Sequence, residues 1–128
     1  MSKENINFYP KEKFYRAIKQ DKPQMWKTLE TGEIVPSSAV FKDSNGVSVD
    51  RQKNRNNDEA VNYIRRSFEE SDIISVKVED CTDIGVRYKS EPLNTNEYHC
   101  LIIGKHKIPL TSSEAKKLAM KAKMEFKH

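Results

Sequence analysis

The sequence predicts a single α+β domain that is built mainly on an antiparallel sheet. Apolar residues recur with a period of two in several short runs and with a helical period in others. The connections between the strand-like runs are short, which favours antiparallel pairing. The chain of 128 residues is long enough for one hydrophobic core and leaves no room for a second domain. We assign this domain to residues 12–128 and expect residues 1–11, which are polar and aperiodic, to form a flexible N-terminal arm.

The first element of the domain is a short strand at residues 13–18, where the side chains alternate between two faces. Arg16 is the charged residue on an otherwise apolar stripe of this strand. Leaving a guanidinium buried without a partner is strongly unfavourable. We therefore expect Arg16 either to form an ion pair with a carboxylate such as Asp50 or Asp80, or to face a ligand cavity.

A short helix is predicted near residues 22–31. Asp21 can cap its start, Pro23 is tolerated in its first turn, and Gly32 can end it. Trp26 lies on the apolar side of this segment, so we expect the helix to pack through that side chain.

The stretch from residue 38 to residue 50 is predicted to form a β-hairpin. Alternating residues flank an Asn45–Gly46 pair, and Asn-Gly tolerates the positive φ angles of a type I′ turn. These residues form either a solvated face, or the wall of a pocket in which hydroxyls and cations bind an anionic ligand while Asp50 orients the cations. The polar residues on this side and at its ends are Ser38, Lys42, Asp43, Ser48, Asp50 and Arg51.

Two longer helices and three strands follow the hairpin. Residues 51–57 form a basic, Asn-rich loop that we expect to be mobile and to close over the polar face of the hairpin. Apolar stripes predict helices at residues 58–70 and 112–126, the second of them behind a capping box from Thr111 to Glu114. Apolar runs predict strands near residues 74–78, 86–88 and 98–103.

His99 begins the last of these strands, which reads as buried on both faces. It is either a core histidine bonded to a backbone carbonyl or to Ser38, or an acid, base or ligand near neutral pH. Cys81 and Cys100 lack the spacing of a disulfide framework or a zinc site and are expected to be buried thiols. The histidines are not at a useful spacing for a metal, so we expect no metal site and no cofactor.

The basic charge of the chain belongs to its C-terminal part. The net charge is +4, and residues 104–128 hold seven Lys against two Glu. This block is either the solvated face of a helix or a surface that attracts nucleic acid or another acidic partner. The sequence contains neither a long apolar segment nor a signal-peptide core, so we expect a cytoplasmic protein that does not enter a membrane.

Three segments resemble a family of small uncharacterised bacterial proteins. The resemblance spans roughly residues 12–120 and implies that these segments belong to one domain, but it carries no activity and no catalytic residue. The segments follow the patterns YRxI at residues 15–18, SSxxFKDSxGxSVDR at residues 37–51 and YHC at residues 98–100.

A weaker resemblance is to the front half of ADP-ribosyltransferase-like folds. In these a strand that bears Arg or His precedes a helix, a Gly-x-Ile step and a Ser-rich strand, and Arg16, residues 32–34 and residues 37–39 follow that order. The Ser-Thr-Ser triplet of that pattern is Ser-Ser-Ala here. No Glu-x-Glu or Gln-x-Glu motif follows, so this resemblance leaves Glu91 or Glu97 as candidates for the acidic residue.

Three functions remain open, because no Walker loop, Rossmann glycine motif, nucleophile elbow or HExxH motif is present. The first is a binding module for an anionic ligand or partner, such as a nucleotide, a nucleic acid or an acidic protein. The second is a small enzyme that processes a nucleotide or phosphate ester, with His99, Ser38 and Asp50 as catalytic candidates. The third is an interaction or assembly protein without a ligand pocket. The candidate binding residues are Arg16, Ser37, Ser38, Lys42, Ser48, Asp50, Arg51, Lys53 and Arg55.

Overall fold

The computed structural model describes residues 7–19 and 21–128. Residues 1–6 of the predicted N-terminal arm lie outside the described residues. The following residues of that arm contact the domain, since the Phe8 ring packs edge-on against Phe14 and Tyr88. Among the described residues, no helix has both the length and the apolar character that crossing a membrane requires.

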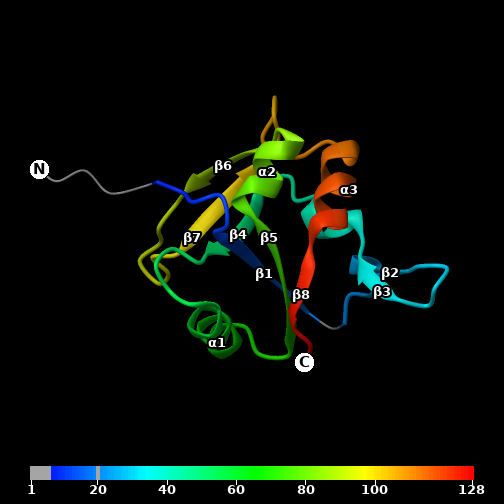
Figure 1. Ribbon diagram of the computed structural model, residues 1–128, viewed down its shortest axis with the longest axis horizontal. Helices are drawn as coiled ribbons and strands as arrows, with labels where there is room; N and C mark the ends of the chain where they lie inside the picture. The colour runs from blue at the N-terminus through cyan, green and yellow to red at the C-terminus, as the bar shows by residue number, and fades with distance from the viewer. Residues whose placement is uncertain (1–6, 20) are drawn as a thin grey trace, which may run out of the picture.

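The centre of the structure is a six-stranded sheet with the strand order β6-β7-β4-β1-β5-β8 (Figure 1). Every ladder in this sheet is antiparallel, which confirms the predicted α+β fold with a mainly antiparallel sheet. A separate two-stranded sheet pairs β2 with β3. The strands are β1 (Lys13–Lys19), β2 (Trp26–Thr28), β3 (Ile34–Pro36), β4 (Val47–Arg51), β5 (Ser71–Lys77), β6 (Arg87–Ser90), β7 (His99–Ile103) and β8 (Lys123–Phe126).

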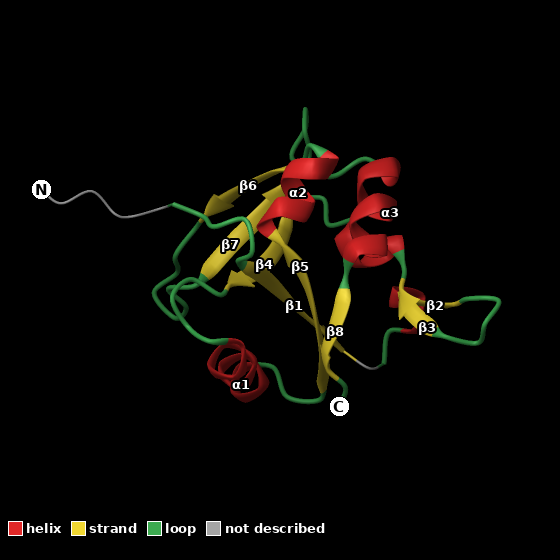
Figure 2. Ribbon diagram, viewed as in Figure 1, coloured by secondary structure: helices red, strands yellow, loops and turns green. Residues whose placement is uncertain are grey.

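Helices cover both faces of the large sheet. α1 (Asn57–Ser67) lies on one side of the strands, and α2 (Val78–Ile84) and α3 (Ser112–Lys121) lie on the other (Figure 2). Successive residues of a strand point to opposite faces. Phe14 therefore joins the hydrophobic cluster that contains residues of α2 and α3, while Tyr15 packs against Ala60 and Ile64 of α1.

The structure confirms the helix predicted at residues 58–70, which is α1. The Asn56 side chain accepts from the backbone N–H of Glu59, and the Glu59 side chain accepts from the backbone N–H of Asn56. The helix ends three residues early. Glu70 adopts a left-handed φ of +59°, which turns the chain into β5.

The helix predicted at residues 112–126 is also present as α3, but its last turn is a strand. Thr111 and Glu114 form the expected capping box. Ala122 is extended, and the following four residues form β8, which pairs with β5. This pairing satisfies backbone groups along the edge of β5 that a continued helix would leave without partners.

The predicted hairpin at residues 38–50 is wrong in its first half. Residues 38–41 form a 3₁₀ turn, η2 (Ser38–Phe41), and β4 pairs with β1 and β7 instead. Val40 and Phe41 are consecutive and both buried, an arrangement that a helical turn permits and an alternating strand does not. Gly46 adopts the positive φ expected of the Asn-Gly pair, but its turn leads from η2 into β4.

The predicted helix near residues 22–31 is also wrong. A single 3₁₀ turn, η1 (Pro23–Met25), leads into β2, and β2 pairs with β3 around a turn that contains Gly32 at a φ of +90°. Leu29 closes this hairpin by donating its N–H to the carbonyl of Glu33. Trp26 packs against the main hydrophobic cluster as expected, although it does so from a strand.

Candidate functional site

The two central strands of the large sheet separate after a short ladder. β1 pairs with β5 along all seven of its residues, but with β4 only at Phe14–Arg51 and Tyr15–Asp50. The sheet therefore consists of two three-stranded halves, β6-β7-β4 and β1-β5-β8, that are joined at one end. Backbone groups beyond this ladder require other partners.

Arg16 occupies the point at which the strands separate. Its Nη1 donates to the backbone carbonyl of Ser48 at 2.7 Å, and its Nη2 donates to the Asp43 carboxylate at 2.9 Å. The expected ion pair is present, but the partner is Asp43 rather than Asp50 or Asp80. The side chain of Arg16 is 16% exposed and that of Asp43 is 42% exposed, so this pair borders solvent.

A cavity of about 120 Å³, which we call the β1–β4 hollow, lies in this gap. Its lining includes Tyr15, Arg16 and Ala17 of β1, Ser48 and Asp50 of β4, and Ile64 of α1. Three of the predicted binding residues, Arg16, Ser48 and Asp50, thus line the hollow, but alternation along the strands points the Arg16 side chain to the face of η2 and the Asp50 side chain to the face of α1.

Asp50 is the most unusual side chain of the hollow. It is 6% exposed, and its Oδ1 accepts a hydrogen bond from Nδ2 of Asn96 at 2.8 Å. Its Oδ2 is buried and has no hydrogen-bond partner within the described part of the chain. Burial raises the pKa of Asp50, although the Asn96 hydrogen bond and the nearby charges of Arg55 and His99 oppose this rise. One oxygen of the Asp50 carboxyl group is therefore available to accept a hydrogen bond.

Arg55 lies beside Asp50 and is held in one orientation. Its Nη2 donates to the carbonyl of Arg51 at 2.7 Å, and its guanidinium carbon stacks 3.5 Å from the centre of the Tyr98 ring. Its Nη1 is buried and, among the described residues, has no hydrogen-bond partner. A guanidinium that is already ordered loses little conformational entropy when it binds a ligand.

A polar cleft of about 570 Å³ runs between α1 and the loop before β7, and we call it the Tyr98 cleft. Arg55, Tyr63 and Arg66 line it together with residues 93–98. Asn96 connects this cleft to Asp50, because its Nδ2 donates to Asp50 while its Oδ1 accepts from the Tyr98 N–H at 3.0 Å. The basic loop predicted to close over the hairpin thus contributes Arg55 to this cleft instead.

His99 stands directly opposite Asp50 in the β4–β7 ladder. Its Nδ1 lies 2.9 Å from the backbone carbonyl of Glu91, as expected for a core histidine bonded to a carbonyl. A carbonyl only accepts hydrogen bonds, so Nδ1 carries the proton and Nε2 is the acceptor in the neutral ring. β7 is an interior strand, but its second face is half-buried rather than fully buried.

Arg51, a predicted binding residue, belongs to a buried ion pair. Its Nε and Nη2 donate to the two carboxylate oxygens of Glu12 at 2.7 Å and 2.9 Å, and the two side chains are 3% and 1% exposed. The guanidinium also donates to the carbonyl of Asn7 and stacks on Phe8. This pair fastens the segment before β1 to β4, and its cation is not open to a ligand.

The remaining predicted residues do not reach the hollow. Ser37 caps η2 and donates to the carbonyl of Gln24, and Ser38 lies within η2. η2 packs into the cluster on the α3 side of the sheet, whereas Asp50 shares the opposite face with Tyr15. Lys42 is exposed, and the N–H of Lys53 donates to Glu12.

Several residues of this region were not among the predicted binding or catalytic residues. Asn96 and Tyr98 lie in a loop and gain their roles only from contacts with distant residues. Tyr15 is the neighbour of Arg16 in β1 and points to the opposite face of the strand. Its hydroxyl donates to Oδ1 of Asn57 at 2.7 Å. Burial and, to a lesser degree, the charge of Glu125 raise the pKa of Tyr15, so this hydroxyl stays protonated.

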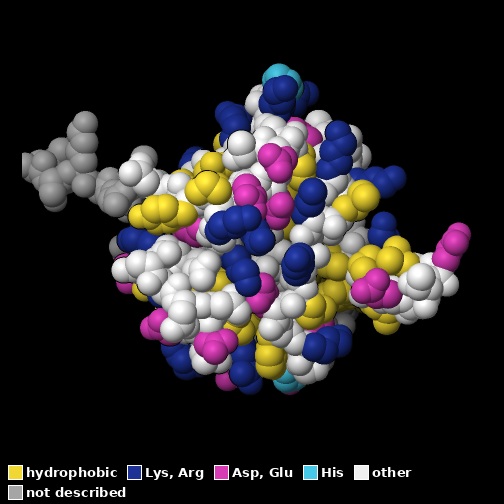
Figure 3. Space-filling view, in the orientation of Figure 1, with side chains coloured by type: hydrophobic (Ala, Val, Ile, Leu, Met, Phe, Trp, Pro, Cys, Tyr) yellow, Lys and Arg dark blue, Asp and Glu magenta, His cyan; other side chains and the backbone are white. Residues whose placement is uncertain are grey.

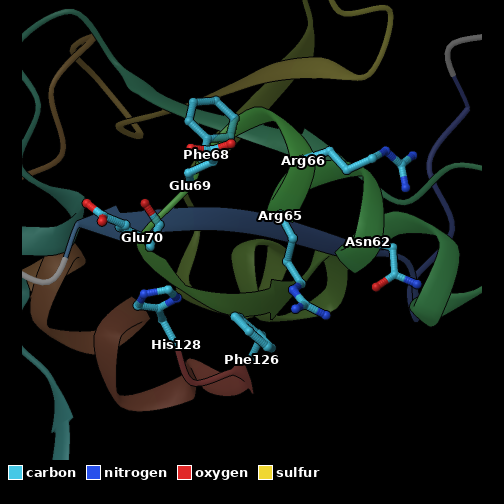
Figure 4. Close-up of a pocket in the computed structure, with 9 residues that line it drawn as sticks. Asn62, Arg65, Arg66, Phe68, Glu69, Glu70, Phe126 and His128 are labelled. Atoms are coloured by element: carbon cyan, nitrogen blue, oxygen red, sulfur yellow. The ribbon is translucent and has the colours of Figure 1, made fainter.

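A further pocket, of about 580 Å³, lies between the end of α1 and the C-terminal strand (Figure 4). The guanidinium of Arg65 stacks there 4.0 Å from the Phe126 ring, and Glu69 and Glu70 supply opposite charge. None of the predicted binding or catalytic residues lines this pocket. In the described ranges, no group of three or more His, Cys, Asp or Glu side chains is placed to hold a metal ion.

Comparisons with protein-family models, with curated proteins and with solved structures found no match for this chain. The two resemblances that the sequence suggests therefore remain predictions.

Proposed function

We propose that the protein is a binding module for an anionic ligand of the nucleotide class, held where β1 and β4 separate. The observation that carries this proposal is the buried Asp50 carboxyl, whose Oδ2 lacks a partner in the described chain and which borders the same hollow as Arg16. Buried polar atoms without partners are rare in native structures, and a missing ligand or water is one explanation.

The chemistry of these two residues suits a phosphorylated sugar. The partner of Arg16 is the exposed carboxylate of Asp43, which a ligand phosphate can replace. The free acceptor of Asp50 suits a ribose hydroxyl, which is how a carboxylate reads the sugar in dinucleotide-binding folds. A ligand that passes through the gap between β1 and β4 can place its phosphate at Arg16, on the η2 side of the sheet, and its sugar at Asp50, on the α1 side.

The β1–β4 hollow alone is too small for a whole nucleotide. Its volume of about 120 Å³ lies below the roughly 300 Å³ at which ligand pockets of proteins begin. We expect the ligand to displace the Asp43 side chain and to occupy part of the surface between the two halves of the sheet.

Thermal denaturation with a panel of ligands tests the proposal. The panel contains NAD, mononucleotides, and cyclic and linear oligonucleotides. A ligand present at about 100 times its Kd adds about 2.7 kcal/mol to the free energy of unfolding, which gives a clear rise in Tm. We expect at least one member to raise the Tm of the unaltered protein.

The variant Asp50→Asn tests whether the ligand that raises the Tm binds at the β1–β4 hollow. It keeps the shape of the side chain but replaces the free acceptor by an amide, so the ligand-induced rise in Tm should fall, measured against the unliganded variant. Asp83→Asn, at an exposed residue of α2, is the control and should respond like the unaltered protein. Equal responses of the two variants contradict the proposed site, and a panel without any effect favours an interaction protein that lacks a ligand pocket.

A second candidate function is suggested by the placement of His99 opposite Asp50, with Arg16 on the next strand. In this alternative the protein processes a nucleotide or phosphate ester, as the likeness to ADP-ribosyltransferase-like folds implies, and His99 acts as acid or base. His99 and Asp50 share the α1 face of the sheet, whereas Ser38 lies in η2 on the other face and has no place in this alternative. The Arg16 side chain also points to that other face and can act only through the gap between β1 and β4.

Chromatography of NAD and mononucleotides after incubation with the protein tests the second candidate. We expect a product that His99→Gln does not form and that His106→Gln, at an exposed loop residue, still forms. Binding without any product would leave the binding module as the function.

A further inference from the structure

A further charged cavity lies on the β1-β5-β8 half of the sheet. Where β5 and β8 cease to pair, a cavity of about 270 Å³ opens between the start of α2 and the end of α3, and we call it the lysine hollow. Four lysines from four different elements line it, and one carboxylate accompanies them. These residues are Lys13, Lys77, Lys121, Lys123 and Asp80.

The lysines differ in how far their charge is already neutralised. The Nζ of Lys13 lies 2.8 Å from the Glu125 carboxylate, and that of Lys77 lies 4.0 Å from Glu79. Lys121 and Lys123 are exposed, and within the described residues neither has a carboxylate within ion-pair distance. The lysine hollow therefore holds two cations that form no ion pair with the described residues.

The backbone brings these two cations together. Lys121 is the last residue of α3, Ala122 is extended, and Lys123 begins β8 opposite Ser75. Figure 3 shows Lys and Arg side chains gathered over the middle of the face formed by β5, β8 and α3, with carboxylates beside them. A concave surface lined mainly by charges of one sign concentrates counter-ions of the opposite sign.

We propose that the lysine hollow binds a phosphate group through Lys121 and Lys123, with Lys77 and Lys13 adding to the positive field. A phosphate group offers several anionic oxygens to separate ammonium groups, whereas a carboxylate offers two. This site is separate from the β1–β4 hollow and does not depend on the function proposed above. The phosphate belongs either to a nucleic-acid backbone or to a free phosphate compound, and the experiment below distinguishes these sources.

Fluorescence anisotropy of a labelled, short single-stranded oligonucleotide measures the affinity of the protein for nucleic acid at low ionic strength and across a salt series. The test variant is Lys121→Ala with Lys123→Ala. The matched control is Lys105→Ala with Lys107→Ala, which removes the same charge from two exposed lysines at the same spacing in the loop after β7. All four residues are exposed, so both double variants should fold, and their Tm values verify this.

We expect the test variant to bind roughly tenfold more weakly than the control and to lower the slope of log K against log salt by about 1.4, since each phosphate contact with a single strand contributes about 0.7. Competition with inorganic phosphate then identifies the source. If inorganic phosphate displaces the oligonucleotide at a concentration equal to that of the oligonucleotide's own phosphate groups, the site binds one free phosphate group. If the oligonucleotide resists displacement, the site binds a nucleic-acid backbone.

Three results overturn the proposal. The first is no oligonucleotide binding and no phosphate-induced rise in Tm at low salt. The second is equal weakening in the two double variants, which means that only the net charge of the protein matters. The third is loss of oligonucleotide binding in Asp50→Asn, which places the phosphate in the β1–β4 hollow instead. If Asp50→Asn binds the oligonucleotide as the unaltered protein does, the phosphate site in the lysine hollow stands, whether or not the nucleotide-binding function proposed above is correct.

Discussion

At the scale of single residues, burying the Asp50 carboxyl group costs stability. Its carboxyl group is buried, accepts one hydrogen bond from Asn96 and leaves Oδ2 without a partner in the described structure. Sites built for function often accept such costs in stability. Asp50 therefore links the stability of the fold to the proposed binding, and both can be measured.

Replacing Asp50 with Asn should stabilise the protein at neutral pH. The pKa of Asp50 is raised from 3.8 in the folded state, chiefly by burial, so the folded state binds the proton more tightly than the unfolded state does. The stability of the unaltered protein then falls as pH rises from 3.8 through the raised pKa and stays lower above it. Urea denaturation across this range should show a growing advantage of Asp50→Asn, and an equal advantage at every pH would contradict the argument.

Asp43 offers a second residue-scale prediction, which rests on the proposed function. Its carboxylate pairs with the Arg16 guanidinium at 2.9 Å, so an anionic ligand must compete with Asp43 for that cation. Asp43→Asn should therefore strengthen the binding of the nucleotide that the thermal screen identifies, by roughly fivefold or more if the coupling is about 1 kcal/mol. Isothermal calorimetry measures this, with Asp83→Asn as the control. Weaker binding by Asp43→Asn would show that Asp43 contacts the ligand favourably.

At the scale of elements, the joint between β1 and β4 is short and depends on a buried ion pair. The Glu12–Arg51 pair, with its contacts to Asn7 and Lys53, connects the segment before β1 to β4 and to the loop before α1. Removing one member of such a pair leaves an uncompensated charge, whereas replacing both by apolar residues removes the desolvation cost as well.

We accordingly expect Glu12→Ala to lower the free energy of unfolding by about 3–5 kcal/mol, because Arg51 is left buried without its carboxylate. The double variant Glu12→Leu with Arg51→Met should recover most of this loss. Urea denaturation of Glu12→Leu, Arg51→Met and the double variant measures the coupling. If the double variant loses as much as the sum of its single variants, the pair is not a coupled unit.

At the scale of the whole molecule, one hydrophobic cluster spans both halves of the sheet. Cys100 lies on β7 in one half, Cys81 lies on α2 next to the other half, and both belong to the same cluster. Burial raises the pKa of each thiol to about 12. Neither thiol is then appreciably ionised near pH 8, and both are shielded from reagents in the folded state.

Both cysteines should therefore react with iodoacetamide at pH 8 at the same slow rate, set by global unfolding, because the shared cluster makes the halves cooperative. Mass spectrometry of tryptic peptides over a urea series reports the two rates. Faster reaction of either thiol below the unfolding midpoint would show that the halves open separately along the β1–β4 gap.

Local patterns in the sequence were sufficient for the α+β class, the strand at β1 and both capped helices. A capping box and an apolar stripe act within a few residues, and so Asn56 with Glu59 and Thr111 with Glu114 mark true helix starts. The same local information misplaced the segments at residues 22–31 and 38–42, where burial of Val40 and Phe41 together against the α3 side overrides their alternating pattern.

The site itself was decided by tertiary structure. The sequence singled out Arg16, Ser48, Asp50 and Arg55, but the ion-pair partners Asp43 and Glu12 and the contacts of Asn96 and Tyr98 became visible only in the fold. The sequence determines which side chains alternate along a strand. Which carboxylate meets which guanidinium depends on where strands far apart in the chain pair and where they separate, and no short-range pattern encodes that choice.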